Sequence, residues 1–262
     1  MTEPLFTRDG ERFVPSAHAR GPWDAGSQHG GAPAALVARA IEALEPGSAM
    51  LVARITFDYL RPVPLEPLTV QAEIVRPGRR LQLAEAELRC GDEVVVRARA
   101  VRLRRGAVEL PAAALAPRGL PCAGPADVPH TPFPGGTGEE GFHRTGMEIR
   151  WIEGSYAEVG PARAWFRFAR ALVDAEAGSP LAVAVAAADF GNGVSRVLEF
   201  SDHLFVNTDL TVHLHRPPDG PWVLLDARTV ADPLGLGLAR SELYDERGPV
   251  GLAAQTLYVD ER

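Results

Sequence analysis

One carboxylate stands out because it ends an entirely apolar segment. Residues 180–188 contain only proline, alanine, leucine and valine, and Asp189 follows them directly. A segment that is apolar on all sides is typical of a buried helix. A carboxylate at its C-terminal end faces the negative end of the helix dipole and loses solvation, and both effects favour uptake of a proton. Asp189 is therefore a candidate general base for activating water; the alternative is a residue that only ends the helix.

A glutamine near the C-terminus is the second candidate. Gln255 lies in a strand-like segment, where two-residue alternation puts it on the same face as Ala253, Leu257 and Val259. An amide group on an apolar face costs free energy unless it finds hydrogen-bond partners. We therefore expect Gln255 either to hold a reactant or to bind buried backbone.

Two glycines precede the first predicted helix. His29, Gly30 and Gly31 stand directly before a helix predicted to begin at Ala32. Free backbone N–H groups at a helix N-terminus can polarise a carbonyl group and stabilise an oxyanion. Glycine also lets an acyl group come close to the main chain. The three residues are candidates for an oxyanion or substrate-binding site; the alternative is a simple entry turn with a structural histidine.

Composition excludes several other chemistries. All 27 basic residues are arginine, so Schiff-base chemistry and a phosphate-loop lysine are excluded. The net charge of −7 argues against a nucleic-acid partner. Cys90 and Cys122 are too few for a disulfide framework or a thiolate metal site, and His213 and His215 fit a solvated strand face better than a zinc pair. We expect no metal and no cofactor.

The sequence also predicts neither a membrane span nor a secretory signal. No stretch approaches 18 consecutive apolar residues, so we expect no membrane span. The first ten residues mix Glu3, Arg8 and Asp9 and lack the apolar run of a secretory signal. Together with the two cysteines, this predicts a cytoplasmic protein.

The elements that must position these residues occur twice. Arg61-Pro62 and Arg216-Pro217 each end an apolar, alternating run, and they are 155 residues apart. The same offset, held without a gap over about 50 residues, relates many further identical positions. Examples are the pairs Thr56 and Thr211, Leu83 and Leu238, Glu87 and Glu242, and Ala98 and Ala253.

A proline- and glycine-rich stretch separates the two copies. Residues 106–146 are rich in proline and contain Gly135-Gly136-Thr137-Gly138, which is typical of an extended linker. The sequence therefore predicts an N-terminal domain over 1–105, a linker over 106–146 and a C-terminal domain over 147–262.

Each copy has one helix followed by strands. The predicted helices are Ala32–Glu45 and 180–188. The predicted strands are Leu68–Arg76, Leu81–Arg89 and Val94–Leu103 in the first copy, and Trp222–Val230, Leu236–Tyr244 and Val250–Val259 in the second. This pattern predicts an α+β fold: two tandem hotdog domains, each an antiparallel sheet wrapped around a central helix.

Several segments resemble the acyl-CoA thioesterase II (TesB-like) family. They are 28–36, which reads QHGGAPAAL; 179–193, which includes Ser179-Pro180-Leu181 and Asp189-Phe190-Gly191-Asn192-Gly193; 206–217, which reads VNTDLTVHLHRP; and Ala254-Gln255-Thr256. Together these segments cover both copies.

The resemblance implies an acyl-CoA thioesterase that splits acyl-CoA into free fatty acid and CoA, as part of fatty acid metabolism. It implies a water held by Asp189, by Asn207 or Thr208, and by Gln255. The family commonly has a threonine two residues before the aspartate of the strand, and here Asn207 stands at that distance from Asp209. The register therefore favours Asn207 over Thr208. A thiolate, with a thiol pKa near ~8.5, leaves without a strong general acid.

Two other functions fit parts of this pattern. A hotdog enoyl-CoA hydratase needs a paired aspartate and histidine near the helix, but no histidine follows Asp189 until His203. A non-catalytic acyl-CoA-binding protein needs no catalytic polar set. The pattern favours the thioesterase over both of these functions.

The polar candidates occur in only one copy. At the offset of 155, Val52 corresponds to Asn207 and Ala100 to Gln255, so we expect one working site per chain. The long, partly apolar strand Val206–His215 suggests an exposed sheet edge. We therefore expect a homodimer of double hotdogs, held in part by sheet edges.

Overall fold

A computed structural model describes residues 2–45, 47–115, 118–133, 139–176 and 178–262. Its strands form one antiparallel sheet with two similar halves. The strand order is β1-β2-β4-β5-β6-β3 in the first half and continues as β10-β13-β12-β11-β8-β7 in the second. The first half contains β1 (Phe6–Asp9), β2 (Arg12–Pro15), β3 (Met50–Tyr59), β4 (Leu68–Arg76), β5 (Leu81–Cys90) and β6 (Glu93–Arg104). The second contains β7 (Met147–Glu153), β8 (Ala162–Phe168), β9 (His203–Asn207), β10 (Asp209–Leu214), β11 (Val223–Asp232), β12 (Leu236–Asp245) and β13 (Gly248–Glu261).

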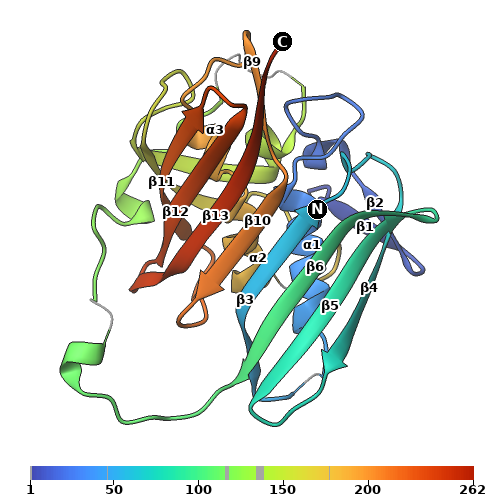
Figure 1. Ribbon diagram of the computed structural model, residues 1–262, viewed down its shortest axis with the longest axis vertical. Coiled ribbons are helices and arrows are strands. Elements are labelled where there is room, and N and C mark those ends of the chain that lie inside the picture. The colour runs from blue at the N-terminus through green and yellow to red at the C-terminus, as the bar shows by residue number, and fades with distance from the viewer. Residues whose placement is uncertain (1, 46, 116–117, 134–138, 177) are drawn as a thin grey trace.

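The two halves meet where β3 pairs with β10, at the centre of Figure 1. Thr56 lies opposite Thr211 in this pairing, and their hydroxyl oxygens are 3.1 Å apart. These two threonines are related by the offset of 155 residues, so the pseudo-twofold axis of the duplication passes between them. The strands β4, β5 and β6 begin 155 residues before β11, β12 and β13. The repeat read from the sequence is therefore present in the fold.

Two helices fill the space enclosed by the sheet. The helix α1 (Gly31–Glu42) packs on β3, β4 and β5, while α2 (Pro180–Ala188) packs on β8, β10, β11 and β12. The helices also pack against each other. Every residue of 181–188 is buried, which explains why α2 has no polar face. The Ser179 hydroxyl caps α2 by accepting hydrogen bonds from the amides of Leu181 and Ala182.

The predicted elements agree with the structure except at a few ends. The first helix, predicted over Ala32–Glu45, spans Gly31–Glu42 in the structure. Glu45 cannot continue it, because its φ of 51° lies in the left-handed region. The predicted strand Val206–His215 is two strands, β9 and β10, which are separated at Thr208.

This break corrects the expectation of a free edge. The strand β10 pairs with β3 on one side and with β13 on the other, so it is an interior strand of the sheet. The sheet ends instead at β1 and β7. The assumption that Val206–His215 offers an open edge to a second chain is therefore wrong, because its partner is the first half of the same chain.

The proline-rich stretch does more than connect the halves. It contains two short 3₁₀ turns, Ala112–Ala114 and Pro125–Asp127, and the turn Phe142–Gly146. Val128 packs with Trp165 in a small apolar cluster, and Phe142 is fully buried in the main core. Residues 134–138, which include the predicted Gly135–Gly138 segment, and 116–117 lie outside the described residues. The domain boundaries at 105 and 146 stay a prediction.

Within the described part of the chain, no helix is both long and apolar enough to cross a membrane.

Candidate active site

Asp189 lies where the C-terminus of α2 meets the N-terminus of α1. It is the C-cap residue of α2 and only 3% exposed. Its Oδ1 accepts hydrogen bonds from Asn207 Nδ2 at 2.8 Å and from the Tyr59 hydroxyl at 3.0 Å. Its Oδ2 lies 3.0 Å from His29 Nδ1. A carboxylate has about four lone-pair positions, so these three contacts leave room for one more donor, such as a water molecule.

The glycine before α1 lets this carboxylate lie directly on the main chain. A Cβ atom added to Gly30 would be 2.9 Å from Asp189 Oδ2 and 3.0 Å from Oδ1, which is closer than such atoms approach. Gly31 is needed for the packing of the helices, since a Cβ there would lie 2.8 Å from the carbonyl oxygen of Ala186 in α2. The two glycines therefore bring the amides at the start of α1 next to Asp189.

One ring nitrogen of His29 has two possible partners. His29 Nδ1 is 3.0 Å from Asp189 Oδ2 and 3.1 Å from the amide nitrogen of Gly31. It donates to the carboxylate only if it carries the proton, and it accepts from the amide only if it does not. We assign the proton to Nδ1, because a lone pair facing an anionic oxygen at 3.0 Å is repulsive. With the proton on Nδ1, the hydrogen bond from the Gly31 amide to this nitrogen is not made.

Gln255 contacts the backbone around Asp189 and not its carboxylate. Its Nε2 donates to the carbonyl oxygen of Asp189 at 3.1 Å, and its Oε1 accepts from the amide of Asn192 at 3.1 Å. Gly191 permits this approach, since a Cβ there would lie 2.8 Å from Gln255 Oε1. The predicted face is buried at Ala253, Gln255 and Leu257, each at most 2% exposed, whereas Val259 at its end is half-buried. The amide thus secures the turn that follows α2.

The structure separates the two candidates at the strand break. Asn207 reaches Asp189, whereas the hydroxyl of Thr208 bonds to the carbonyl oxygen of Thr256 at 3.3 Å and the side chain is exposed. The backbone of Thr208 ties the two halves together, because its carbonyl accepts from the amide of Tyr59 at 3.0 Å.

Tyr59 is a site residue that the sequence reasoning missed. It comes from β3 in the first half, and its hydroxyl donates to Asp189 in the second. Burial first, and then the charge and hydrogen bond of Asp189, hold the pKa of Tyr59 well above its ordinary value, so it stays a neutral donor. The available signal was alternation along β3, since Tyr59 shares a face with the buried residues Ile55 and Phe57.

The corresponding place in the first half has apolar side chains where Tyr59 and Asn207 hold Asp189. At the offset of 155, Leu214 corresponds to Tyr59, and Val52 to Asn207. Both line a cavity of about 80 Å³ beside Leu181. Two cavities of about 640 and 590 Å³ lie next to the Asp189 cluster.

The other polar features noted in the sequence lie elsewhere. His213 and His215 are exposed. On the outer face of the first half, Arg97 bonds to Glu87 at 3.2 Å, and Arg99 bonds to Glu85.

Comparison with known proteins identifies both halves. A family model described as the acyl-CoA thioesterase N-terminal domain matches residues 19–103, and one described as the acyl-CoA thioesterase C-terminal domain matches residues 125–259. No curated protein matches the chain.

Solved structures agree in fold over nearly the whole chain. A hot dog fold protein of unknown function from Alicyclobacillus acidocaldarius is 21% identical, with a TM-score of 0.72; 97% of this chain and 95% of that one are covered. The TesB protein of Mycobacterium avium subsp. paratuberculosis is 16% identical, with a TM-score of 0.67 and coverage of 97% and 96%. The acyl-CoA thioesterase II TesB2 of Mycobacterium marinum is 15% identical, with a TM-score of 0.64 and coverage of 99% and 94%.

The tandem hotdog fold expected from the sequence is confirmed by these neighbours. The family models together account for most of both halves, including every candidate residue of the Asp189 cluster. The chain therefore belongs to the acyl-CoA thioesterase family, as a double hotdog protein and a thioester hydrolase.

Proposed function

We propose that the chain hydrolyses acyl-CoA to free fatty acid and CoA by direct attack of a water molecule that Asp189 activates. The observation that carries this proposal is the buried Asp189 carboxylate, which three side chains orient against the glycine turn before α1. A base held in this way can accept a proton from water at hydrogen-bond distance.

The reaction follows from this arrangement in two steps. The water oxygen bonds to the thioester carbonyl carbon, and its proton passes to Asp189. The negative charge that develops on the carbonyl oxygen is stabilised by the backbone N–H groups of the Gly30–Gly31 turn, at the positive end of the α1 dipole. The carbon–sulfur bond then breaks and the acid remains, while the departing CoA thiolate takes the proton from Asp189, which returns to its carboxylate form. Asn207 and Tyr59 orient Asp189, and Gln255 holds the turn that follows α2. Thr208 contributes through its backbone carbonyl, which accepts a hydrogen bond from the amide of Tyr59.

Replacement of Asp189 tests the mechanism. We expect Asp189→Ala and Asp189→Asn to lower kcat for acyl-CoA by about 10²–10⁴-fold, the usual contribution of a general base. Thiol release is the measurement, and circular dichroism checks the fold. The control Asp9→Asn, in an exposed ion pair with Arg12, should keep wild-type turnover. Unchanged turnover in a folded Asp189 variant would remove the proposed base.

The His29–Asp189 contact gives a second candidate function. The sequence favours thioester hydrolysis over hydration of enoyl-CoA, because no histidine follows Asp189 until His203. In the structure, however, His29 lies 3.0 Å from the Asp189 carboxylate. Loss of enoyl absorbance with crotonyl-CoA would support the hydratase, and binding of acyl-CoA without thiol release would support a binding protein. We expect neither result.

The location and assembly of the protein are also proposals. With two cysteines and no disulfide framework, the chain suits the reducing cytoplasm.

The homodimer no longer rests on the strand Val206–His215. It rests instead on exposed apolar residues of the outer sheet face, where Val230 pairs with Leu238 and Leu236 with Tyr258. Light scattering should give about twice the chain mass of 28.1 kDa; a monomer at micromolar concentration would contradict the dimer.

A further inference from the structure

Two neighbouring cavities, which share Gly21 in their linings, border the Asp189 cluster. The first, of about 640 Å³, is lined at its inner end by Gly30, Tyr59 and Asn207, and we call it the apolar cavity. The second, of about 590 Å³, touches the cluster at His29 and Phe190, and we call it the arginine cavity. An acyl-CoA also has two arms on either side of the reacting carbonyl carbon, one an acyl chain and the other a long chain that carries phosphates.

The walls of the apolar cavity suit a hydrocarbon chain. Its apolar side chains are Trp23, Leu60, Pro62, Val63, Leu204 and Val206. Its one cationic residue, Arg61, is paired with Glu93 at 2.8 Å. Its one carboxylate, Asp24, accepts a hydrogen bond from Ser27 at 2.8 Å. This cavity therefore offers no unpaired positive charge to a phosphate group.

The arginine cavity has the opposite character. Its charged lining consists of three arginines, Arg20, Arg144 and Arg262, and two carboxylates, Glu139 and Glu140. Arg20 lies 3.6 Å from a carboxylate oxygen of Glu139, and Glu140 lies 3.6 Å from His18 Nε2. The other two arginines have no carboxylate at ion-pair distance among the described residues. The guanidinium of Arg144 instead lies 4.2 Å from the ring centre of Phe133, and that of Arg262 lies 5.4 Å from the ring centre of Trp23.

An arginine held on an aromatic ring is well prepared to bind phosphate. Stacking fixes the plane of the guanidinium and leaves its N–H groups free to bond two phosphate oxygens at once. The neighbouring His143 adds no positive charge, because burial first, and then His29 and Arg144, lower its pKa to about 3. Among the described residues of this cavity, Arg144 and Arg262 are therefore the cations that are available to bind a polyanionic ligand.

We infer that the phosphate-bearing arm of CoA lies in the arginine cavity and the acyl chain in the apolar cavity, with Leu204 setting the longest chain accepted. This inference rests on the proposed function, since it assigns the two ends of the same substrate. An alkyl chain gains free energy with each methylene removed from water, and CoA gains from each phosphate that meets a cation.

The geometry of β9 singles out Leu204. Leu204 and Val206 line the apolar cavity, while Phe205 between them points the other way and is 2% exposed. Asn207, which bonds to Asp189, follows directly. Leu204 is three residues from Asn207 along the strand, about 10 Å at 3.3 Å per residue. A larger side chain at this position should shorten the cavity without touching the reacting group.

The acyl arm is tested by narrowing the apolar cavity. Leu204→Trp should lower kcat/KM for dodecanoyl-CoA at least 10-fold and leave butyryl-CoA within 2-fold of the wild type. The same shift should appear with N-acetylcysteamine thioesters of both acids, which lack the nucleotide. An equal loss for both chain lengths, or none, would overturn the assignment of the acyl chain.

The CoA arm is tested at Arg144. Arg144→Gln should raise KM for butyryl-CoA about 10-fold, but should not change kcat/KM for the N-acetylcysteamine thioester of the same acid. Gly193→Leu, which adds a side chain where a Cβ would meet no atom within 4 Å, should likewise weaken only the CoA thioester. The control Arg247→Gln removes an exposed arginine at a distant corner of the second half and should change neither.

The reverse outcome is equally clear. If Arg61→Gln raises KM for CoA thioesters and Arg144→Gln does not, the two arms lie the other way round. If the wild type releases no thiol from any of these thioesters, the proposed function itself fails. The arginine cavity is then tested by binding alone: an equal Kd of the wild type and Arg144→Gln for butyryl-CoA in calorimetry would overturn it. The two failures are therefore distinguishable.

Discussion

At the scale of residues, the site depends on one carboxylate with fixed surroundings. Asp189 receives hydrogen bonds from Tyr59 and Asn207 on one oxygen and faces His29 with the other. Only 3% of the residue is exposed, so these neighbours rather than bulk water set its position. A buried charge that keeps its hydrogen bonds is tolerated, and one that loses them is costly. Small changes to the neighbours should therefore act on the reaction through Asp189.

Removal of one hydroxyl should lower the rate. Tyr59→Phe deletes the 3.0 Å hydrogen bond to Asp189 Oδ1 but keeps the ring. A hydrogen bond to a charged group contributes about 1.5–3 kcal/mol. We expect kcat to fall by about 10- to 100-fold with little change in KM. The matched control is Tyr258→Phe, which removes a hydroxyl from an exposed tyrosine on β13. A Tyr59→Phe variant with wild-type kcat would show that the hydroxyl does not orient the base.

Addition of one methyl group should have a similar effect. In Gly30→Ala the new Cβ would lie 2.9 Å from Asp189 Oδ2, so the carboxylate or the turn must move. A displacement of about 1 Å at a reacting group can cost ~10²-fold in rate. Steady-state kinetics should show this loss with a thermal midpoint close to that of the wild type. The control is Gly106→Ala, where a Cβ meets no atom within 4 Å. Equal rates in the two variants would contradict this account.

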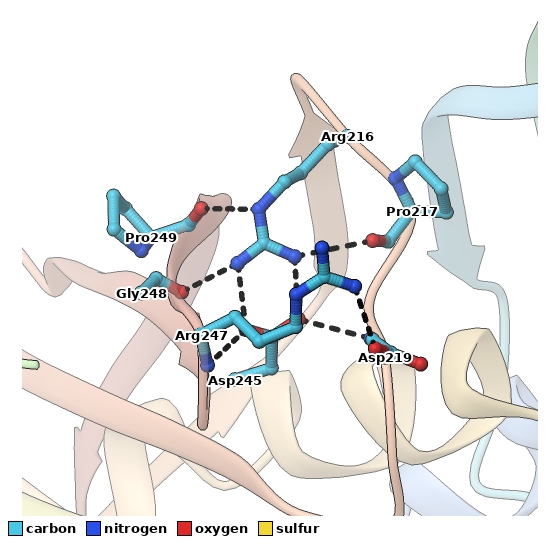
Figure 2. A network of polar contacts seen from close by, with 7 residues as sticks. All are labelled: Arg216, Pro217, Asp219, Asp245, Arg247, Gly248 and Pro249. Atoms are coloured by element: carbon cyan, nitrogen blue, oxygen red, sulfur yellow. Dashed lines mark hydrogen bonds and ion pairs between the residues drawn. The ribbon is translucent and has the colours of Figure 1, made fainter. Parts of the chain in front are cut away.

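At the scale of elements, a buried ion pair joins the corner after β10 to the hairpin between β12 and β13 (Figure 2). Arg216 donates to both carboxylate oxygens of Asp245, at 2.5 and 2.6 Å, and to the carbonyl oxygens of Pro249 and Gly248. The amides of Asp219 and Arg247 also donate to Asp245, which is fully buried.

The copy of this corner in the first half has no such pair. At the offset of 155, Arg61 corresponds to Arg216, and Cys90 to Asp245. Arg61 pairs instead with Glu93, and both side chains are more than half exposed. The arginine–proline motif is therefore shared by both halves, but only the second half uses it to secure a buried hairpin.

The buried pair should make stability depend on pH. Burial alone would raise the pKa of Asp245, but the hydrogen bonds from Arg216 and the two amides outweigh it and hold the pKa below its ordinary value of about 3.9. Because the unfolded state then takes up the proton first, the contribution is complete above about pH 5 and is lost as the pH falls through the unfolded pKa toward the folded one.

Asp245→Asn measures this contribution. At pH 7 we expect the free energy of unfolding to fall by about 1.5–3 kcal/mol, because the half-buried Arg216 loses the charged partner of its hydrogen bonds. Urea titrations should show the difference from the wild type shrinking as the pH falls below about 5. Asp219→Asn, which breaks the exposed pair with Arg247 at the same corner, should change stability little. A difference that stays constant down to acid pH would contradict the linkage.

At the scale of the whole molecule, duplication has left the halves similar in fold and different in chemistry. The pseudo-twofold axis between Thr56 and Thr211 generates a second place like the Asp189 site. There, Val52 and Leu214 replace Asn207 and Tyr59, and the cavity is only about 80 Å³. The working site itself takes His29, Gly30 and Tyr59 from one half and the rest from the other, so neither half contains it alone.

One substrate should therefore bind per chain. Titration with a non-hydrolysable acyl-CoA should give a stoichiometry of one by calorimetry. Asp189→Ala should remove nearly all turnover, since the place in the first half has neither the amide nor the phenol that would orient a base. Two equivalent binding sites, or half of the wild-type turnover left in the variant, would contradict a silent first half.

The sequence by itself determined the duplication, the element pattern and part of the site. The offset of 155 residues, the apolar helix before Asp189 and the buried face of Gln255 are local patterns, and each of them is present in the fold. They are visible in one chain because burial repeats with the period of a helix or a strand.

Only the tertiary structure decided which residues meet at Asp189. Tyr59 reaches it because β3 pairs with β10, and His29 reaches it because the start of α1 packs against the end of α2. Asn207 contacts it and the Thr208 hydroxyl does not, because the chain breaks between β9 and β10. These contacts join residues up to 160 positions apart. Periodicity shows which face of an element is buried, but it does not show which distant element covers that face.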